Sequence, residues 1–93
     1  MATYKKGDQE TLDFGIDWSD LLEDEGVTIS TSTWYVESGI TKDSDSSSST
    51  ATTIVLSGGT AGTLYKCTNV ITTSGVPVFE RSFNVLVLED KFK

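Results

Sequence analysis

The sequence predicts an all-β protein, an immunoglobulin-like antiparallel β-sandwich of six to seven strands. Short runs of residues alternate between apolar and polar, and turn residues recur every 8–14 positions. The 93-residue chain suits a single domain. One flat sheet would leave its apolar face uncovered, so two sheets must pack together. We place the domain at residues 12–89, between a flexible N-terminal arm at 1–11 and a charged tail at 90–93.

The first part of the chain contains two strand signals and one helical signal. Residues 1–11 have no apolar period and are therefore interpreted as an arm. Residues 12–18 alternate and predict a half-buried strand. Residues 19–26 begin with a capping-type serine and end in glycine, which suits one short helical turn or a tight acidic loop. Residues 27–37 predict a long strand, whose change of phase indicates a bulge or a break.

The second part begins with a low-complexity segment at residues 42–49, which is rich in serine. None of its side chains is suited to a hydrophobic core, so we expect a surface loop or a mobile edge. The remaining signals are strands at 50–57, 63–73 and 78–88, joined by turns at 58–62 and 74–77. The alternation is clearest at 63–73 and 78–88, which we expect to pair as a hairpin.

Composition excludes several classes of function. The formal charge is −7, with 14 acidic and 7 basic residues, so the basic surface of a nucleic-acid-binding protein is missing. No apolar run is long enough to span a membrane, and no signal peptide precedes the first strand. Histidine is absent, which removes the commonest general base and metal ligand. We therefore expect no enzyme activity, no catalytic residue, no metal and no cofactor.

Tyr65 and Cys67 have the spacing of the tyrosine corner in immunoglobulin-like domains, and Trp34 lies in an earlier strand. The second cysteine of the inter-sheet disulfide is missing, so we expect Cys67 to be a small buried apolar residue. We also expect Trp18, Trp34 and Tyr65 to be buried and structural.

Two further patterns fail as functional motifs. Asp43 and Asp45 are spaced as in a calcium loop, but the glycine and the glutamate that complete an EF-hand are absent. The glycine-rich residues 58–62 lack the lysine and the strand–loop–helix context of a phosphate-binding loop. We interpret both segments as surface structure.

The sharpest charge asymmetry lies in residues 8–25, which contain eight acidic residues and no basic one. Two interpretations remain open: a solvated face that maintains solubility, or a patch that binds a basic partner. The candidate partner-binding residues are Asp8, Glu10, Asp13, Asp17, Asp20, Glu23, Asp24 and Glu25.

Four stretches resemble a known family. They are residues 12–22, 29–34, 53–65 and 68–75, and they include a Trp-Ser-Asp block and a Leu-Ser-Gly-Gly-Thr-Ala-Gly-Thr block. Together they are similar to the small Ig-like structural proteins of tailed bacteriophages, which are encoded among head and head–tail connector genes. The resemblance covers roughly residues 12–88.

The resemblance implies a virion protein that assembles in the host bacterial cytoplasm and binds the major capsid protein or neck and tail proteins. The main expectation is a head decoration protein, present in many copies in a symmetric assembly. One alternative is a neck or tail adaptor that anchors a fibre. A second is a module that binds glycans or the host surface through exposed aromatic residues, for which the candidates are Tyr4, Tyr35 and Phe92.

Overall fold

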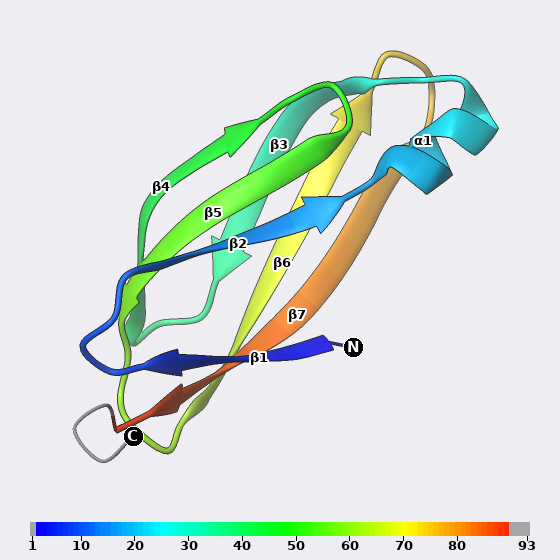
Figure 1. Ribbon diagram of the computed structural model, residues 1–93. Helices are drawn as coiled ribbons and strands as arrows, with labels where there is room; N and C mark the ends of the chain where they lie inside the picture. The colour runs from blue at the N-terminus through cyan, green and yellow to red at the C-terminus, as the bar shows by residue number, and fades with distance from the viewer. Residues whose placement is uncertain (1, 90–93) are drawn as a thin grey trace.

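The computed structural model describes residues 2–89, which form two packed sheets and one short helix (Figure 1). The elements are β1 (Ala2–Gly7), β2 (Leu12–Asp17), α1 (Ser19–Glu25), β3 (Ile29–Val36), β4 (Ile40–Ser47), β5 (Ala51–Gly58), β6 (Leu64–Thr73) and β7 (Val78–Leu88). One sheet has the strand order β1-β7-β6-β3, and the other has the order β2-β5-β4. The prediction of an all-β sandwich is confirmed.

The strand order is that of an immunoglobulin-like domain. Strands β2, β5 and β4 occupy the positions called B, E and D, and β3, β6 and β7 occupy C, F and G. The first strand departs from the constant-type order, since β1 pairs with β7 and not with β2. This pairing is parallel, whereas the other strand pairs are antiparallel. The expected antiparallel arrangement therefore holds for every pair but this one in the described part of the chain.

The expectation of a flexible arm at residues 1–11 is corrected by β1. Residues Ala2–Gly7 align with Phe83–Leu88 of β7, and this backbone pairing needs no apolar period in the sequence. The Lys6 side chain is fully buried, and its Nζ donates hydrogen bonds to the carbonyl oxygens of Gly7 and Gly58, both at 2.7 Å. These bonds tie β1 to the turn that follows β5. The tail expected at residues 90–93 lies outside the described residues.

Of the two expectations for residues 42–49, the surface loop is wrong and the position at an edge is right, because most of the segment belongs to β4. This strand forms an edge of its sheet, and seven of its eight residues are exposed. Pairing with β5 satisfies its backbone on one side, and this does not require side chains that fill a core. The Nζ of Lys42 contacts Asp45 Oδ2 at 2.8 Å on the exposed surface.

The helical turn and the strand irregularity were predicted correctly. α1 ends at Gly26, which has a φ of 66° and caps the helix in the left-handed conformation. The N-cap residue is Trp18 and not the expected Ser19, and the Ser19 N–H is bound by Asp17 Oδ1 at 2.9 Å. In β3 the register shifts between Ile29 and Thr31, within the predicted change of phase.

The core lies between the two sheets, and Trp18, Trp34 and Tyr65 are buried there as predicted. The Tyr65 hydroxyl accepts a hydrogen bond of 2.8 Å from the backbone N–H of Thr60, five residues upstream. This is the bond expected of a tyrosine corner. Because the Thr60 N–H donor stabilises the charged phenolate more than the neutral phenol, this bond lowers the pKa of Tyr65.

Asn69 forms a polar junction in the middle of this core, where its side chain is fully buried. Its Oδ1 accepts hydrogen bonds from Thr52 Oγ1 (2.7 Å) and from Trp18 Nε1 (3.2 Å). Its Nδ2 donates to Ser32 Oγ (2.9 Å) and to the Thr33 carbonyl oxygen (3.1 Å). Asn69 thus connects β6 to β3 within one sheet and, through Thr52 and Trp18, to the opposite sheet.

Replacing Asn69 with alanine should lower the free energy of unfolding by about 3 kcal/mol, because several buried polar groups lose their partner at once. Urea unfolding followed by tryptophan fluorescence measures the change. Thr72→Ala on the same strand is the control, since it removes only the exposed Thr31–Thr72 hydroxyl bond. We expect it to cost less than about 1 kcal/mol. Equal costs for the two variants would contradict the role given to Asn69.

Candidate interaction surfaces

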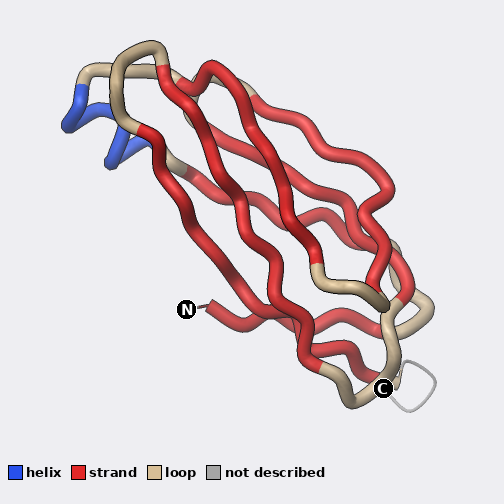
Figure 2. The backbone as a smooth tube through the Cα atoms, turned by 180° about the vertical axis from the view of Figure 1, so that it is seen from behind, coloured by secondary structure: helices blue, strands red, loops and turns tan. Residues whose placement is uncertain are grey.

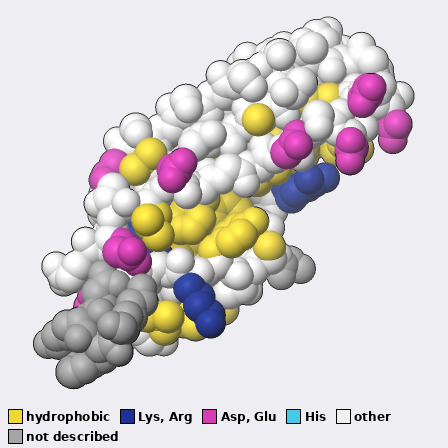
Figure 3. All heavy atoms as spheres, in the orientation of Figure 1, with side chains coloured by type: hydrophobic (Ala, Val, Ile, Leu, Met, Phe, Trp, Pro, Cys, Tyr) yellow, Lys and Arg dark blue, Asp and Glu magenta, His cyan; other side chains and the backbone are white. Residues whose placement is uncertain are grey.

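The eight acidic residues that cluster in the sequence between positions 8 and 25 do not form one surface. Asp8 and Glu10 lie in the β1–β2 connection, Asp13 lies on the exposed side of β2, and five lie at or near α1. The five are Asp17, Asp20, Glu23, Asp24 and Glu25. Six-residue β2 separates the two ends by roughly 20 Å, in a molecule with a long axis of 46 Å. Figure 3 shows acidic side chains gathered at the α1 end.

Two of these carboxylates have local structural roles. Glu10 Oε1 accepts a hydrogen bond of 2.6 Å from the Gly7 backbone N–H, which closes the β1–β2 turn. Asp17 accepts one from the Ser19 N–H at the start of α1. The bonds from the Ser19 backbone and hydroxyl favour the charged carboxylate, so they hold the pKa of Asp17 below its usual value.

At the α1 end, three segments lie together: residues 17–28, which include α1, and the turns at 48–50 and 74–78. We call these segments the loop end. Figure 2 shows the helix and neighbouring loops together at one end of the molecule. The N–H of Trp18 donates to the Thr50 carbonyl oxygen (2.9 Å), and the N–H of Ile29 donates to that of Ser49 (3.0 Å). Ser74 N–H donates to the Thr28 carbonyl oxygen at 2.9 Å. These bonds hold the loops in fixed relative positions.

The loop end also exposes apolar side chains. Val76 is 95% exposed at the tip of the β6–β7 hairpin, and Val78 is 61% exposed at the start of β7. A Cβ at Gly75 would come within 2.9 Å of Val27 Cγ1, so the hairpin packs closely on the segment after α1. The loop end therefore presents exposed valines beside five exposed carboxylates. Sequence reasoning identified these acids but missed the valines, because residues 74–77 look like an ordinary turn.

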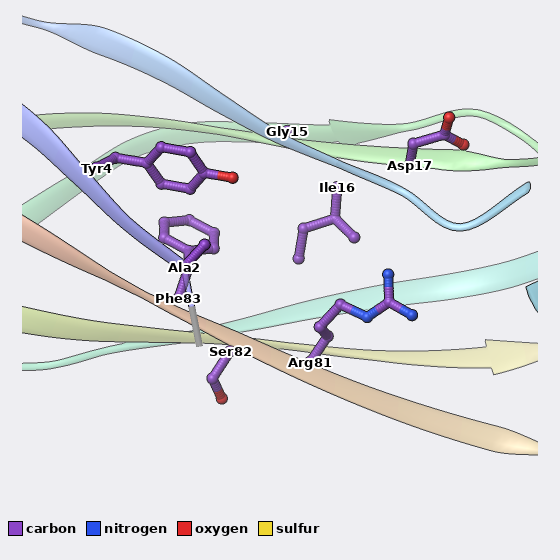
Figure 4. A pocket seen from close by; sticks show the side chains of 8 residues that line it. All are labelled: Ala2, Tyr4, Gly15, Ile16, Asp17, Arg81, Ser82 and Phe83. Carbon is purple, nitrogen blue, oxygen red and sulfur yellow. The ribbon is translucent and has the colours of Figure 1, made fainter.

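A second surface lies on the open side of the sandwich, between β2 and β7. A pocket of about 310 Å³ opens there, and its lining residues are Ala2, Tyr4, Gly15, Ile16, Asp17, Arg81, Ser82 and Phe83. Tyr4, Ile16, Phe83 and Arg81 point into it, whereas Asp17 and Ser82 point away (Figure 4). The Arg81 guanidinium lies 4.7 Å from the centre of the Trp18 ring, in a cation–π contact. Sequence reasoning did not predict this pocket.

The exposed aromatic candidates for glycan binding do not come together. Tyr4 is 41% exposed on β1, and its ring contacts Phe14 and Phe83 at centroid distances of 5.7 and 5.3 Å. Tyr35 is 61% exposed on β3, the opposite edge of the four-stranded sheet. It lines a shallow hollow with Glu37 and Lys66. Phe92 lies outside the described residues.

The motifs that failed in the sequence are structural here as well. Asp43 Oδ1 accepts a bond from Ser57 Oγ at 2.9 Å, and Asp45 pairs with Lys42. Within residues 2–89, no three His, Cys, Asp or Glu side chains are grouped closely enough to hold a metal ion. The glycines at 58, 59 and 62 have positive φ angles and form the β5–β6 turn. No helix in the same range is long and apolar enough to cross a membrane.

Cys67 is fully buried on β6, as predicted, and forms no disulfide. Burial disfavours the thiolate and raises the pKa of Cys67 to about 11, and the nearby charge of Glu37 acts in the same direction. A thiol of this kind is a poor nucleophile at neutral pH. It therefore acts as part of the core.

These observations define a small immunoglobulin-like module whose distinctive features are its loop end and its open side. The family described as podophage GP4 fiber-tail adaptor protein gp77 matches residues 6–86, and the chain belongs to this family. The resemblance to structural proteins of tailed phages is thereby confirmed, and the chain is a structural component of a phage virion. A comparison with curated proteins found no match.

The raised pKa of Cys67 predicts a specific dependence of stability on pH. The folded thiol has a pKa of about 11 and the ordinary value is 9.0, so its contribution is complete below about pH 9 and is lost as pH rises toward 11. The free energy of unfolding should therefore fall more steeply over this range in the wild type than in Cys67→Ala. Denaturant melts at pH 8, 9, 10 and 11 measure both slopes. Equal slopes in the two proteins would contradict the raised pKa of Cys67.

Proposed function

We propose that this protein is a fiber-tail adaptor that joins a fibre to the tail by binding both, without catalysis. The observation that carries the proposal is the family match, since its range of 6–86 includes part or all of every strand of both sheets. The family's description names fibre and tail, so it favours the adaptor alternative over the expected head decoration protein. Assembly in the host cytoplasm is part of the proposal and agrees with the unpaired Cys67.

For one of the two attachments we propose the loop end. Its five carboxylates would steer a basic partner toward it and fix the orientation of the complex. Val76 and Val78 supply apolar surface, which gains free energy when a partner covers it. The backbone bonds among the three loops reduce the ordering that binding requires. Asp8, Glu10 and Asp13 lie outside this surface.

The adaptor function predicts the composition of particles made without this protein. Heads and tails should assemble, and the fibres should be missing. Quantitative mass spectrometry of wild-type particles should give a copy number far below that of the major capsid protein and in a simple ratio to the fibre protein. A ratio near one to the capsid protein, with fibres retained in the deletion, would support head decoration instead.

The loop end predicts the effect of charge reversal. The double variant Glu23→Lys/Asp24→Lys should fold normally, because both side chains are exposed, and should be incorporated into particles at least about tenfold less. Asp43→Lys on exposed β4 is the matched control and should be incorporated normally. Incorporation is measured by mass spectrometry after complementation of a deletion phage. Normal incorporation of the double variant would show that the loop end is not an attachment surface.

A further inference from the structure

The outer edge of β2 has no strand beside it in the described structure. Its sheet has the order β2-β5-β4, so β2 pairs on one side only, along residues Leu12–Asp17. In an antiparallel strand, alternate residues direct their N–H and C=O groups away from the neighbour. These groups of β2 point toward the open side of the sandwich. Such an edge is a template for a further strand.

The immunoglobulin topology identifies this edge as an empty strand position. In the constant-type domain the sheet contains four strands, A, B, E and D, and strand A pairs with B. Here β1 pairs with β7 in the other sheet, so the sheet consists of B, E and D alone. Figure 1 shows β2 at this edge, with β1 in the other layer. The fold therefore leaves vacant the place that strand A fills elsewhere.

The pocket on the open side fits the inward-facing side chains of such a strand. Tyr4, Ile16 and Phe83 provide its apolar lining, and the Tyr4 ring is still 41% exposed. Figure 3 shows hydrophobic side chains gathered on this face. A strand added beside β2 would cover them, which favours apolar residues at every second position of the incoming segment.

The outward face of β2 favours a basic segment. Asp13, Gly15 and Asp17 alternate along this face, and all three are exposed. In an antiparallel pairing of two copies centred on Gly15, Asp13 of one copy would face Asp17 of the other, and like charges directly opposed are destabilising. The edge is therefore unsuited to self-pairing and complementary to lysine or arginine.

Nothing in the fold of the single chain requires glycine at position 15. Its φ is not positive, and an added Cβ would make only an ordinary contact, 3.4 Å from the Thr52 carbonyl oxygen. Glycine in the interior of a strand weakens the strand, and it often marks a place where another backbone or side chain approaches closely. An incoming strand beside β2 would use the open space at Gly15.

We propose that β2 accepts, as a fourth strand, an extended segment of a partner virion protein whose side chains alternate between apolar and basic. The apolar side chains enter the pocket beside Tyr4 and Phe83, and the basic ones lie along Asp13 and Asp17. This proposal rests on the adaptor function and assigns it a second attachment, which shares Asp17 with the loop end but none of its other acids and neither of its valines.

A peptide experiment tests the site without reference to the phage. The probe is acetyl-Lys-Val-Lys-Val-Lys-Val-Lys-amide, added to the ¹⁵N-labelled protein and followed by NMR shifts and amide exchange. We expect saturable binding, with shifts and new protection concentrated in residues 12–17. The same peptide with glutamate in place of lysine, and one methylated at every backbone nitrogen, should each bind at least about tenfold more weakly. Shifts confined to α1, or equal binding of the methylated peptide, would overturn the proposal.

Three variants sharpen this test. Gly15→Val should leave stability unchanged or higher, because the side chain is exposed and valine favours strands, and should weaken peptide binding at least about threefold. Asp13→Lys should weaken it similarly, whereas Asp43→Lys, on the opposite edge of the sheet, should leave it unchanged. Folding of each variant is checked by urea unfolding. Unchanged affinity in both Gly15→Val and Asp13→Lys would refute the strand site.

The fibre content of phage particles then distinguishes a failure of the β2 attachment from a failure of the adaptor function. If the deletion phage retains its fibres, the adaptor function fails, whatever the peptide does. If fibres are lost in the deletion but Asp13→Lys and Gly15→Val restore them as fully as Asp43→Lys does, the adaptor function stands and the β2 attachment is refuted. We expect Asp13→Lys and Gly15→Val particles to carry fewer fibres, counted by electron microscopy.

Discussion

The buried side chain of Asn69 is the interaction on which the arrangement of the two sheets depends. In immunoglobulin-like domains with an inter-sheet disulfide, a covalent bond holds the layers together. Here Cys67 has no partner, and Asn69, two residues further along β6, bonds across the gap to Thr52 and Trp18. The two N–H donors of the amide bind β3 in the same sheet, and its oxygen accepts bonds from Thr52 and Trp18. These directional bonds together hold the two sheets in one relative position. Trp18 in turn is the N-cap residue of α1 and contacts Arg81, so this junction adjoins both candidate surfaces.

The strands that alternate between core and solvent could be predicted from the sequence, and those that do not were missed. β6 places every second side chain in the core, and β7 does so from Phe83 to Val87, so the period of two identifies both strands. β4 buries only Ile40, so its serine-rich sequence resembles a loop, although its backbone pairs with β5. β1 pairs with the far end of the chain and buries a lysine. A parallel pairing between residues about 80 positions apart leaves no local pattern to detect.

The candidate surfaces were also hard to predict, because they depend on contacts between residues that are distant in the sequence. The acids of residues 8–25 are conspicuous in the sequence because no basic residue interrupts them, but a strand runs through the segment and separates its two ends. What brings Val76 beside α1 is the packing of the β6–β7 hairpin against Val27, a contact between segments almost 50 residues apart. The open side depends on which sheet the first strand joins, and no composition or spacing argument addresses that choice. The family resemblance identified the class of protein, since its conspicuous blocks are local in sequence.

Within residues 2–89 the three-stranded sheet has two edges without a neighbouring strand, β2 and β4, and these edges matter before the protein is assembled. Before a virion protein is assembled, copies of it can meet one another through their exposed surfaces. Exposed strand edges are common starting points for aggregation. On β4 the edge carries Lys42, Asp43 and Asp45 among serines, and on β2 it carries Asp13 and Asp17. These charges disfavour edge-to-edge pairing of two copies, although the outer backbone groups of both edge strands remain unpaired in the described structure.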